Sequence, residues 1–181
     1  MKKLILKFSA IFLRSGSMLQ FIWAQDEAGN IGLNGEMPWY LPNDLKHFKS
    51  VTLNHPVVMG RKTWEGLSIK PFPKRKNILL TSQKDYCVPE EVELMHSKEE
   101  VLAFAETSEI PVFIVGGANV YKQFREEVDV LYQTIIHETF EADTQFPTID
   151  FSKFELIEEK FVEAHQKENT FDHTFRKYVR K

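Results

Sequence analysis

The chain has 181 residues, of which 43% are hydrophobic and 27% are charged, and it contains one cysteine. This length suits a single domain with a full core, and the composition excludes a disordered chain. The net charge of -3 gives no bulk attraction to nucleic acid. The lone Cys87 cannot form an internal disulfide, which favours a reducing compartment. We therefore expect a cytoplasmic, monomeric globular protein without a nucleic-acid or membrane partner.

The first seventeen residues differ from the rest of the chain. Residues 1–13 read MKKLILKFSAIFL, in which basic residues precede an apolar stretch that Lys7 interrupts. This stretch is shorter than the ~20 apolar residues of a membrane span. Three interpretations are open, namely a non-essential leader, an interfacial or partner-binding helix, and an export signal. We expect the leader, so that residues 1–17 are an N-terminal extension and residues 18–181 form the functional domain.

From Met18 onward, apolar runs alternate with helical patterns. Strands are predicted at residues 18–24, 56–59, 77–80, 92–95, 112–115, 130–137, 154–164 and 171–179. Helices are predicted after Pro42 and at residues 63–67, 97–106 and 118–126. Residues 25–40, with three glycines and one proline, are typical of a long functional loop. The order predicts a single α/β domain with a mostly parallel central sheet, helices on both faces and a C-terminal antiparallel hairpin at the edge.

One candidate site lies where the predicted strand at 112–115 runs through Gly116 and Gly117 into a helix. Bare glycine backbone lets a phosphate approach closely, and the start of a helix offers free N–H groups. The pattern differs from the GxGxxG of dinucleotide-binding domains. By itself it fits a tight turn that needs glycine equally well. It therefore indicates a diphosphate site only if other residues support it.

Two polar clusters supply that support. Arg61, Lys62 and Thr63 follow one predicted strand, and Thr81 and Ser82 follow the next. Taken singly, such residues are ordinary solvated surface groups, but the carboxyl ends of neighbouring parallel strands meet at one edge of a sheet. An arginine together with a serine suits a 2′-phosphate. The glycine turn and these two polar clusters together therefore predict a groove for NADP rather than NAD.

Asp44 lies in the first turn of the helix after Pro42. Leu41, Leu45 and Phe48 mark the predicted buried face of that helix. The simpler interpretation is an acidic residue favoured by the helix dipole. The functional one is a buried carboxylate with a raised pKa, suited to a cationic or donor-rich heterocycle. No other acidic residue or cysteine has a comparable sequence setting, and the histidines show no metal-ligand spacing, so no metal site is predicted.

Seven motifs follow one another in a fixed order after Met18. They are Ile31-Gly32, Met37-Pro38-Trp39, Leu41-Pro42-x-Asp44-Leu45-x-x-Phe48, Met59-Gly60-Arg61-x-Thr63-Trp64-Glu65, Pro71-x-Pro73-x-Arg75-x-Asn77, Val115-Gly116-Gly117 and Asp143-Thr144-x-Phe146-Pro147. Together they resemble the bacterial-type dihydrofolate reductases, from Met18 to Lys181. The resemblance implies reduction of 7,8-dihydrofolate to 5,6,7,8-tetrahydrofolate, with hydride from NADPH and a proton to N5, and it makes antifolate inhibitors expected ligands.

The resemblance also implies roles for single residues. Asp44 would bind the pteridine and promote protonation at N5, with Trp39 holding a water nearby and Thr134 supporting Asp44 by a hydrogen bond. Arg75 would bind the α-carboxylate of the glutamate tail. The other substrate-binding residues would be Ile22, Ala24, Leu45, Phe48, Leu67, Phe72, Val115 and Tyr121. The cofactor-binding residues would be Ala24, Ile31, Gly32, Gly35, Arg61, Lys62, Thr63, Leu80, Thr81, Ser82, Val115, Gly116, Gly117, Ala118, Asn119, Val120, Tyr121, Gln123 and Thr144.

The resemblance further implies that the loop at 25–40 closes over the nicotinamide, braced by the loop around Asp143. Two other functions are compatible with part of the pattern. A pyrimidine reductase of riboflavin synthesis would keep the glycine turn and the phosphate groove, but it gives no reason for Asp44 together with Arg75. A non-catalytic NADP-binding protein would not need Asp44. The presence of Asp44 therefore favours the folate reductase.

Overall fold

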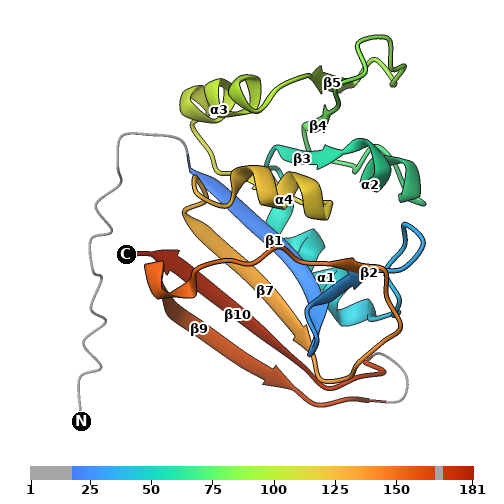
Figure 1. Cartoon of the computed structure of the whole chain (residues 1–181), viewed down its shortest axis with the longest axis vertical. Helices are drawn as coiled ribbons and strands as arrows, with labels where there is room; N and C mark the ends of the chain where they lie inside the picture. Colours follow the sequence, from blue (N-terminus) through green and yellow to red (C-terminus); the bar gives the residue numbers. More distant parts are fainter. Residues whose placement is uncertain (1–17, 166–168) are drawn as a thin grey trace.

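The computed structural model describes residues 18–165 and 169–181, so the predicted leader lies outside the described residues. One eight-stranded sheet has the order β5-β4-β3-β6-β1-β7-β10-β9, and β2 pairs with β8 in a second, two-stranded sheet (Figure 1). The strands are β1 (Leu19–Asp26), β2 (Asn30–Gly32), β3 (Val57–Gly60), β4 (Asn77–Leu80), β5 (Val92–Met95), β6 (Val112–Ile114), β7 (Val130–Ile136), β8 (Thr144–Gln145), β9 (Phe154–Val162) and β10 (His173–Arg180). The helices are α1 (Pro42–Thr52), α2 (Arg61–Gly66), α3 (Lys98–Thr107) and α4 (Ala118–Phe124), with a 3-10 turn at Phe151–Lys153.

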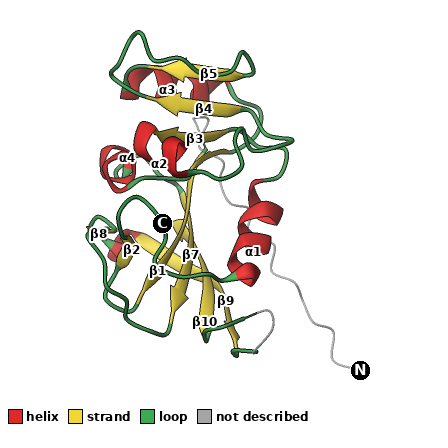
Figure 2. Cartoon of the chain, turned by 90° about the vertical axis from the view of Figure 1, so that its right-hand side faces the viewer, coloured by secondary structure: helices red, strands yellow, loops and turns green. Residues whose placement is uncertain are grey.

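The large sheet is parallel from β5 to β7 and antiparallel at its C-terminal end, where β10 pairs with both β7 and β9. Its central strands are covered on both faces, with α4 and α1 on opposite sides (Figure 2). Every residue of β4 is buried, as expected for a parallel strand between two layers of helices. The predicted α/β architecture and its terminal hairpin are therefore confirmed. Within the described residues, no helix is long and apolar enough to cross a membrane.

The predicted buried face of α1 is wrong at Leu45, which is 43% exposed. Phe48 is only half-buried. The helix meets the core at its two ends, where Leu41 and Thr52 are 2% and 0% exposed. Apolar spacing predicts which side chains share a helix face, but it does not reveal how much of that face the rest of the protein covers.

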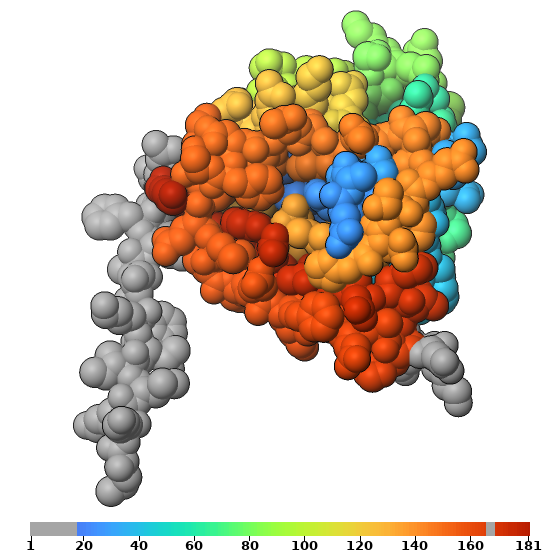
Figure 3. All heavy atoms as spheres, turned by 60° about the horizontal axis from the view of Figure 1, so that its bottom comes forward, coloured from blue at the N-terminus to red at the C-terminus, as the bar shows by residue number. Residues whose placement is uncertain are grey.

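The predicted loop at 25–40 contains more regular structure than expected. Strand β1 continues to Asp26, and β2 pairs antiparallel with β8, with Asn30 opposite Gln145 and Gly32 opposite Thr144. In the space-filling view, the blue segment around β2 is set among the orange residues of the 140s (Figure 3). A pairing of two short strands that are more than a hundred residues apart leaves no local periodicity, so the sequence pattern missed it.

Candidate active site

Asp44 and Thr134 meet as the sequence predicts. The Thr134 hydroxyl, on β7, donates a hydrogen bond of 2.6 Å to Oδ1 of Asp44 in the first turn of α1. Burial raises the pKa of the Asp44 carboxyl, and this effect outweighs the opposing influences of the Thr134 hydroxyl and of the electrostatic interaction with His173. A carboxyl with a raised pKa can hold a proton closer to neutral pH than an exposed one.

Trp39 contributes a second polar group of this region. Its ring is 7% exposed and packs in a small cluster with Leu41 and Ile136, with Ala24 alongside. The buried indole N–H has no acceptor among the residues that the structure describes. An indole nitrogen can only donate, and a buried donor without a partner is costly. Trp39 is therefore suited to donating a hydrogen bond to a water or a ligand.

The residues expected to wall the substrate pocket form one apolar group, with Leu45 as the exception. Ile22 is buried in a cluster against which the other four pack, namely Phe48, Leu67, Phe72 and Val115. Tyr121 is 3% exposed, and its hydroxyl donates to the Ile22 carbonyl oxygen at 2.7 Å. Burial raises the pKa of the Tyr121 phenol. Tyr121 therefore remains a neutral donor whose proton already has a backbone acceptor.

Arg75 is held at the border of this apolar group. Its guanidinium carbon lies 5.9 Å from the ring centre of Phe48 and 5.8 Å from that of Phe72. Nε donates to Thr52 Oγ1 at 2.9 Å, and the two Nη atoms donate to the carbonyl oxygens of Pro73 at 2.7 Å and Lys49 at 2.9 Å. A guanidinium has about five N–H donors, so about two stay available. This rigid fork suits a carboxylate.

The glycine turn meets one of the two polar clusters predicted to accompany it. The peptide between Gly116 and Gly117 is cis, and Gly116 has φ +125°. A Cβ atom at Gly116 or Gly117 would lie 3.3 Å or 3.1 Å from Thr63 Oγ1. The Gly60 N–H donates to the Gly116 carbonyl oxygen at 2.8 Å, which joins the end of β3 to the turn. A side chain at either glycine would therefore crowd Thr63, and bare backbone is what a close phosphate approach requires.

The other residues predicted to line the cofactor groove differ from one another in their contacts and in their exposure. Arg61 donates from Nη1 to Glu65 Oε1 at 2.8 Å, and that carboxylate also accepts from the Tyr86 hydroxyl at 3.1 Å. The sequence interpretation missed Glu65 as the partner of Arg61, although the spacing of four residues was visible. Among the other cofactor candidates, Gly32, Leu80, Thr81 and Val120 are buried, Ala24, Ile31, Ala118 and Thr144 are half-buried, and Gly35, Lys62, Ser82, Asn119 and Gln123 are exposed.

The family model described as dihydrofolate reductase matches residues 18–180. The chain belongs to the dihydrofolate reductase family. The dihydrofolate reductase of Lactococcus lactis is 43% identical over 163 residues, which cover 89% of this chain and 96% of that protein. The one from Bacillus subtilis is 38% identical over 168 residues, covering 91% and 95%.

A solved structure, described as the dihydrofolate reductase from Enterococcus faecalis complexed with NADP(H) and RAB-propyl, shares 47% identity with this chain at a TM-score of 0.86. The match covers 91% of this chain and 96% of that one. These similarities confirm the predicted fold and the predicted enzyme class, an NADPH-dependent oxidoreductase. They favour the folate reductase over the riboflavin-pathway and non-catalytic alternatives.

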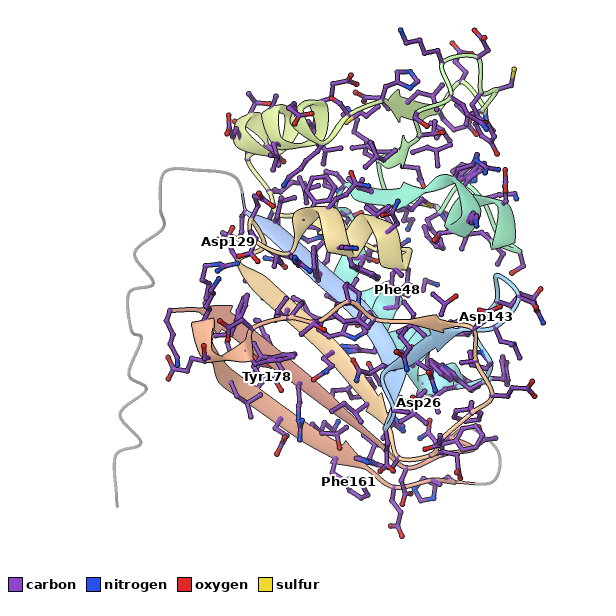
Figure 4. The ribbon with its side chains drawn as sticks, viewed as in Figure 1. Asp26, Phe48, Asp129, Asp143, Phe161 and Tyr178 are labelled. Carbon is purple, nitrogen blue, oxygen red and sulfur yellow. The ribbon has the colours of Figure 1, made fainter. Side chains whose placement is uncertain are left out.

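The predicted contact between the loop at 25–40 and the segment around Asp143 is present in this reductase. The Asn34 N–H donates to Asp143 Oδ2 at 2.8 Å, and the Asp143 N–H donates to the Gly32 carbonyl oxygen at 3.1 Å. Asp143 lies beside β2 (Figure 4). The Asn34 N–H and the Thr144 hydroxyl lower the pKa of the Asp143 carboxyl, so it stays ionised as an acceptor for the loop.

A second acidic residue, Asp26, is shielded more completely than the half-buried Asp44, which corrects the sequence interpretation. Asp26, at the end of β1 (Figure 4), is 0% exposed. Burial alone would raise its pKa, but donors from Phe140, Asn30 and Ala28 lower it. Its Oδ1 accepts from the N–H groups of Ala28 and Asn30 at 2.9 and 2.8 Å, and its Oδ2 accepts from Phe140 N and Asn30 Nδ2 at 2.9 and 2.8 Å. Four donors make Asp26 a fixed structural anion, whereas the Asp44 side chain has one hydrogen-bond partner among the described residues, the Thr134 hydroxyl.

We expect Asp26→Asn to destabilise the fold by about 2–4 kcal/mol, because an amide NH₂ would face donors where Oδ2 now accepts. The lowered pKa of Asp26 means that its stabilisation is present above its ordinary value near 3.8 and is lost as pH falls through the folded value. The gap between parent and variant should therefore be full at neutral pH and narrow in acid. Denaturant unfolding at several pH values measures this, and a gap that does not change with pH would contradict it.

Proposed function

We propose that the chain reduces 7,8-dihydrofolate to 5,6,7,8-tetrahydrofolate at a centre formed by Asp44, Trp39 and Thr134. The observation that carries this proposal is the Asp44 carboxyl, whose pKa burial raises and which accepts a hydrogen bond of 2.6 Å from the Thr134 hydroxyl. Family membership supports the reaction, and this carboxyl supplies what the reaction demands of the protein, a proton source near N5.

Each residue then has a separate task. Thr134 occupies Asp44 Oδ1, which orients the carboxyl and leaves Oδ2 to accept from the N–H donors of the pteridine. The Trp39 N–H, which has no acceptor in the described part of the chain, can hold a water through which a proton reaches N5. Arg75 binds the α-carboxylate of the glutamate tail and thereby fixes the far end of the substrate. NADPH, when bound, supplies the hydride that dihydrofolate accepts at C6.

The glycine turn and its neighbours are suited to the cofactor. Gly116 and Gly117 place no side chain between their backbone and a ligand, and a Cβ atom at either position would lie close to Thr63 Oγ1. We assign the diphosphate to this turn and the 2′-phosphate to Arg61 and Ser82. Loss of NADPH absorbance in the presence of dihydrofolate tests the whole proposal. A purified protein that binds NADPH but does not oxidise it with this substrate would refute it.

Removing Arg61 should reduce the preference for NADPH over NADH. We expect Arg61→Leu to shrink the ratio of the two kcat/KM values by about 10- to 100-fold, since a charge-assisted bond is worth about 1.5–3 kcal/mol. Glu65→Gln is the matched control, because it weakens the Arg61–Glu65 pair and leaves the arginine charged. This variant should keep the NADPH preference or increase it. An unchanged ratio in Arg61→Leu would remove Arg61 from the 2′-phosphate site.

We further propose that the domain acts as a cytoplasmic monomer and that residues 1–17 are dispensable. The shift in composition at Met18 supports the second point, and the family model begins at residue 18. A chain that starts at Met18 should match the full chain in turnover and in Tm. A Tm lower by several degrees would show instead that the extension packs on the domain.

A further inference from the structure

A histidine outside the assigned catalytic centre is hydrogen-bonded to the helix that carries Asp44. His173, on β10, is 0% exposed. Its Nδ1 lies 2.9 Å from the Phe171 carbonyl oxygen, and its Nε2 lies 2.8 Å from Asn43 Nδ2. Because a carbonyl can only accept, Nδ1 carries the proton, and in the neutral ring Nε2 is left to accept from the Asn43 amide. The network therefore assigns one tautomer to His173.

The partner of His173 sits directly before Asp44 in the chain. Helix α1 has no side-chain cap at Leu41, and Pro42 at its first position has no N–H to offer. The first turn is instead joined to the sheet by two side-chain bonds, from Asn43 to His173 at 2.8 Å and between Asp44 and Thr134 at 2.6 Å. These two bonds hold consecutive residues of the turn.

The two anchors belong to neighbouring strands. Strands β7 and β10 pair antiparallel, with Thr134 opposite Phe175 and His173 opposite Ile136. Both anchors are almost fully buried, with exposures of 1% for Thr134 and 0% for His173. The hydroxyl anchor orients the carboxyl itself, and the imidazole anchor holds the backbone that presents it. Because both bonds attach the same helical turn to the sheet, we expect each to support the other.

We propose that His173 is a positioning residue for Asp44, acting through Asn43 to fix the first turn of α1 in the orientation that lets the carboxyl meet both Thr134 and the pteridine. This inference rests on the proposed function. It does not require His173 to change its charge. Asp44 and His47 both interact electrostatically with His173.

A competing explanation is that His173 only fills space. Its ring makes an edge contact with Phe175, with the ring centres 5.0 Å apart. His47 packs on the same phenylalanine, with the ring centres 4.2 Å apart. The two explanations predict different effects of replacing His173 with phenylalanine, which would preserve activity only if the ring alone matters. His173→Phe keeps an aromatic ring against Phe175 and removes the acceptor. His173→Gln loses the ring but supplies an amide oxygen for Asn43 and an N–H for the Phe171 carbonyl.

The test measures kcat/KM for dihydrofolate, Kd for NADPH and Tm in His173→Phe, His173→Gln, Asn43→Ala and the double variant His173→Phe/Asn43→Ala. We expect about a tenfold fall in kcat/KM in each of the variants His173→Phe and Asn43→Ala, no further fall in the double variant, and recovery to within about twofold in His173→Gln. NADPH affinity should stay within about twofold throughout, because the residues assigned to the cofactor phosphates lie on other elements. His137→Phe is the matched control, since its Nε2 bonds Thr174 Oγ1 at 2.8 Å without contacting α1.

Three results would overturn the proposal. They are independent, additive effects of the two single variants, a His173→Gln variant as slow as His173→Phe, and normal kcat/KM in Asn43→Ala. If His173→Phe does not fold, the half-buried Asn43 still decides the question through Asn43→Ala. A parent protein without reductase activity would refute the proposed function. An active parent with unaffected variants would refute only the role of His173.

Discussion

Asp44→Asn should lower kcat/KM for dihydrofolate by about 100-fold or more at neutral pH, the usual range for losing a positioned proton donor. The amide keeps the shape of the side chain and still accepts from Thr134, but it can neither carry a proton nor bear the negative charge that binds the pteridine. NADPH affinity should change by no more than about twofold, because the glycine turn and Thr63 form a separate set of contacts.

The dependence on pH is the sharper part of this prediction. Burial raises the pKa of Asp44, so the protonated unit that Asp44 forms with its substrate should be present below that raised value and be lost above it. The parent should therefore lose activity as pH rises through this value and level off below it. The variant must use substrate protonated in solution, so its rate should continue to climb as pH falls.

Profiles of kcat/KM against pH for both proteins measure this difference, with Asp150→Asn as the control. Asp150 is an exposed aspartate that caps the turn before β9, and its replacement should leave the profile of the parent intact. Near-parent activity of Asp44→Asn at neutral pH, or a flat profile, would show that Asp44 is not the catalytic carboxyl.

Arg75→Lys should raise KM for dihydrofolate by about 10- to 100-fold and change kcat much less, because lysine keeps the charge but loses the planar fork that grips a carboxylate. Lysine also cannot replace the three bonds that hold the guanidinium against Thr52, Pro73 and Lys49. Steady-state kinetics with dihydrofolate measure the effect. NADPH affinity should not change.

Two controls separate carboxylate binding from a general loss of structure. A dihydropterin without the glutamate tail should be reduced equally well by parent and variant. Thr52→Val removes the Nε partner of Arg75 and keeps the guanidinium, so it should raise KM for dihydrofolate only slightly. If Arg75→Lys lowers the rate with both substrates alike, Arg75 is a structural residue and not the site of the α-carboxylate.

The central strands and the glycine turn were predictable from the sequence because their signals are local. Apolar runs such as residues 77–80 mark strands buried on both faces, and two consecutive glycines at the end of such a run mark a close backbone approach. The Asp44–Thr134 contact came from the order of family motifs, since neither residue reveals the other by periodicity. The structure placed the two side chains at 2.6 Å.

Other features were settled only when distant segments came together. The sequence singled out Asp44 and gave no sign that Asp26 is also shielded from solvent, yet the pKa of Asp26 falls and that of Asp44 rises. The difference depends on how many hydrogen-bond donors reach each carboxylate. One of the donors to Asp26 is the N–H of Phe140, which is 114 residues away in the sequence. The exposure of Leu45 likewise depends on what α1 touches and not on its helical spacing.

The sequence by itself therefore determined the fold class, the family and the types of residue expected to take part in the reaction. These could be predicted because periodicity and the order of motifs are visible in the linear sequence. The tertiary structure decided in which direction the pKa values of Asp26 and Asp44 shift, and which contacts hold Asp44. The bond from Asn43 to His173 joins residues 130 positions apart. Hydrogen bonds between such distant residues depend on strand register and on where the helix packs. The pKa of a side chain depends on its burial and its hydrogen-bond partners, which are established only when the chain folds.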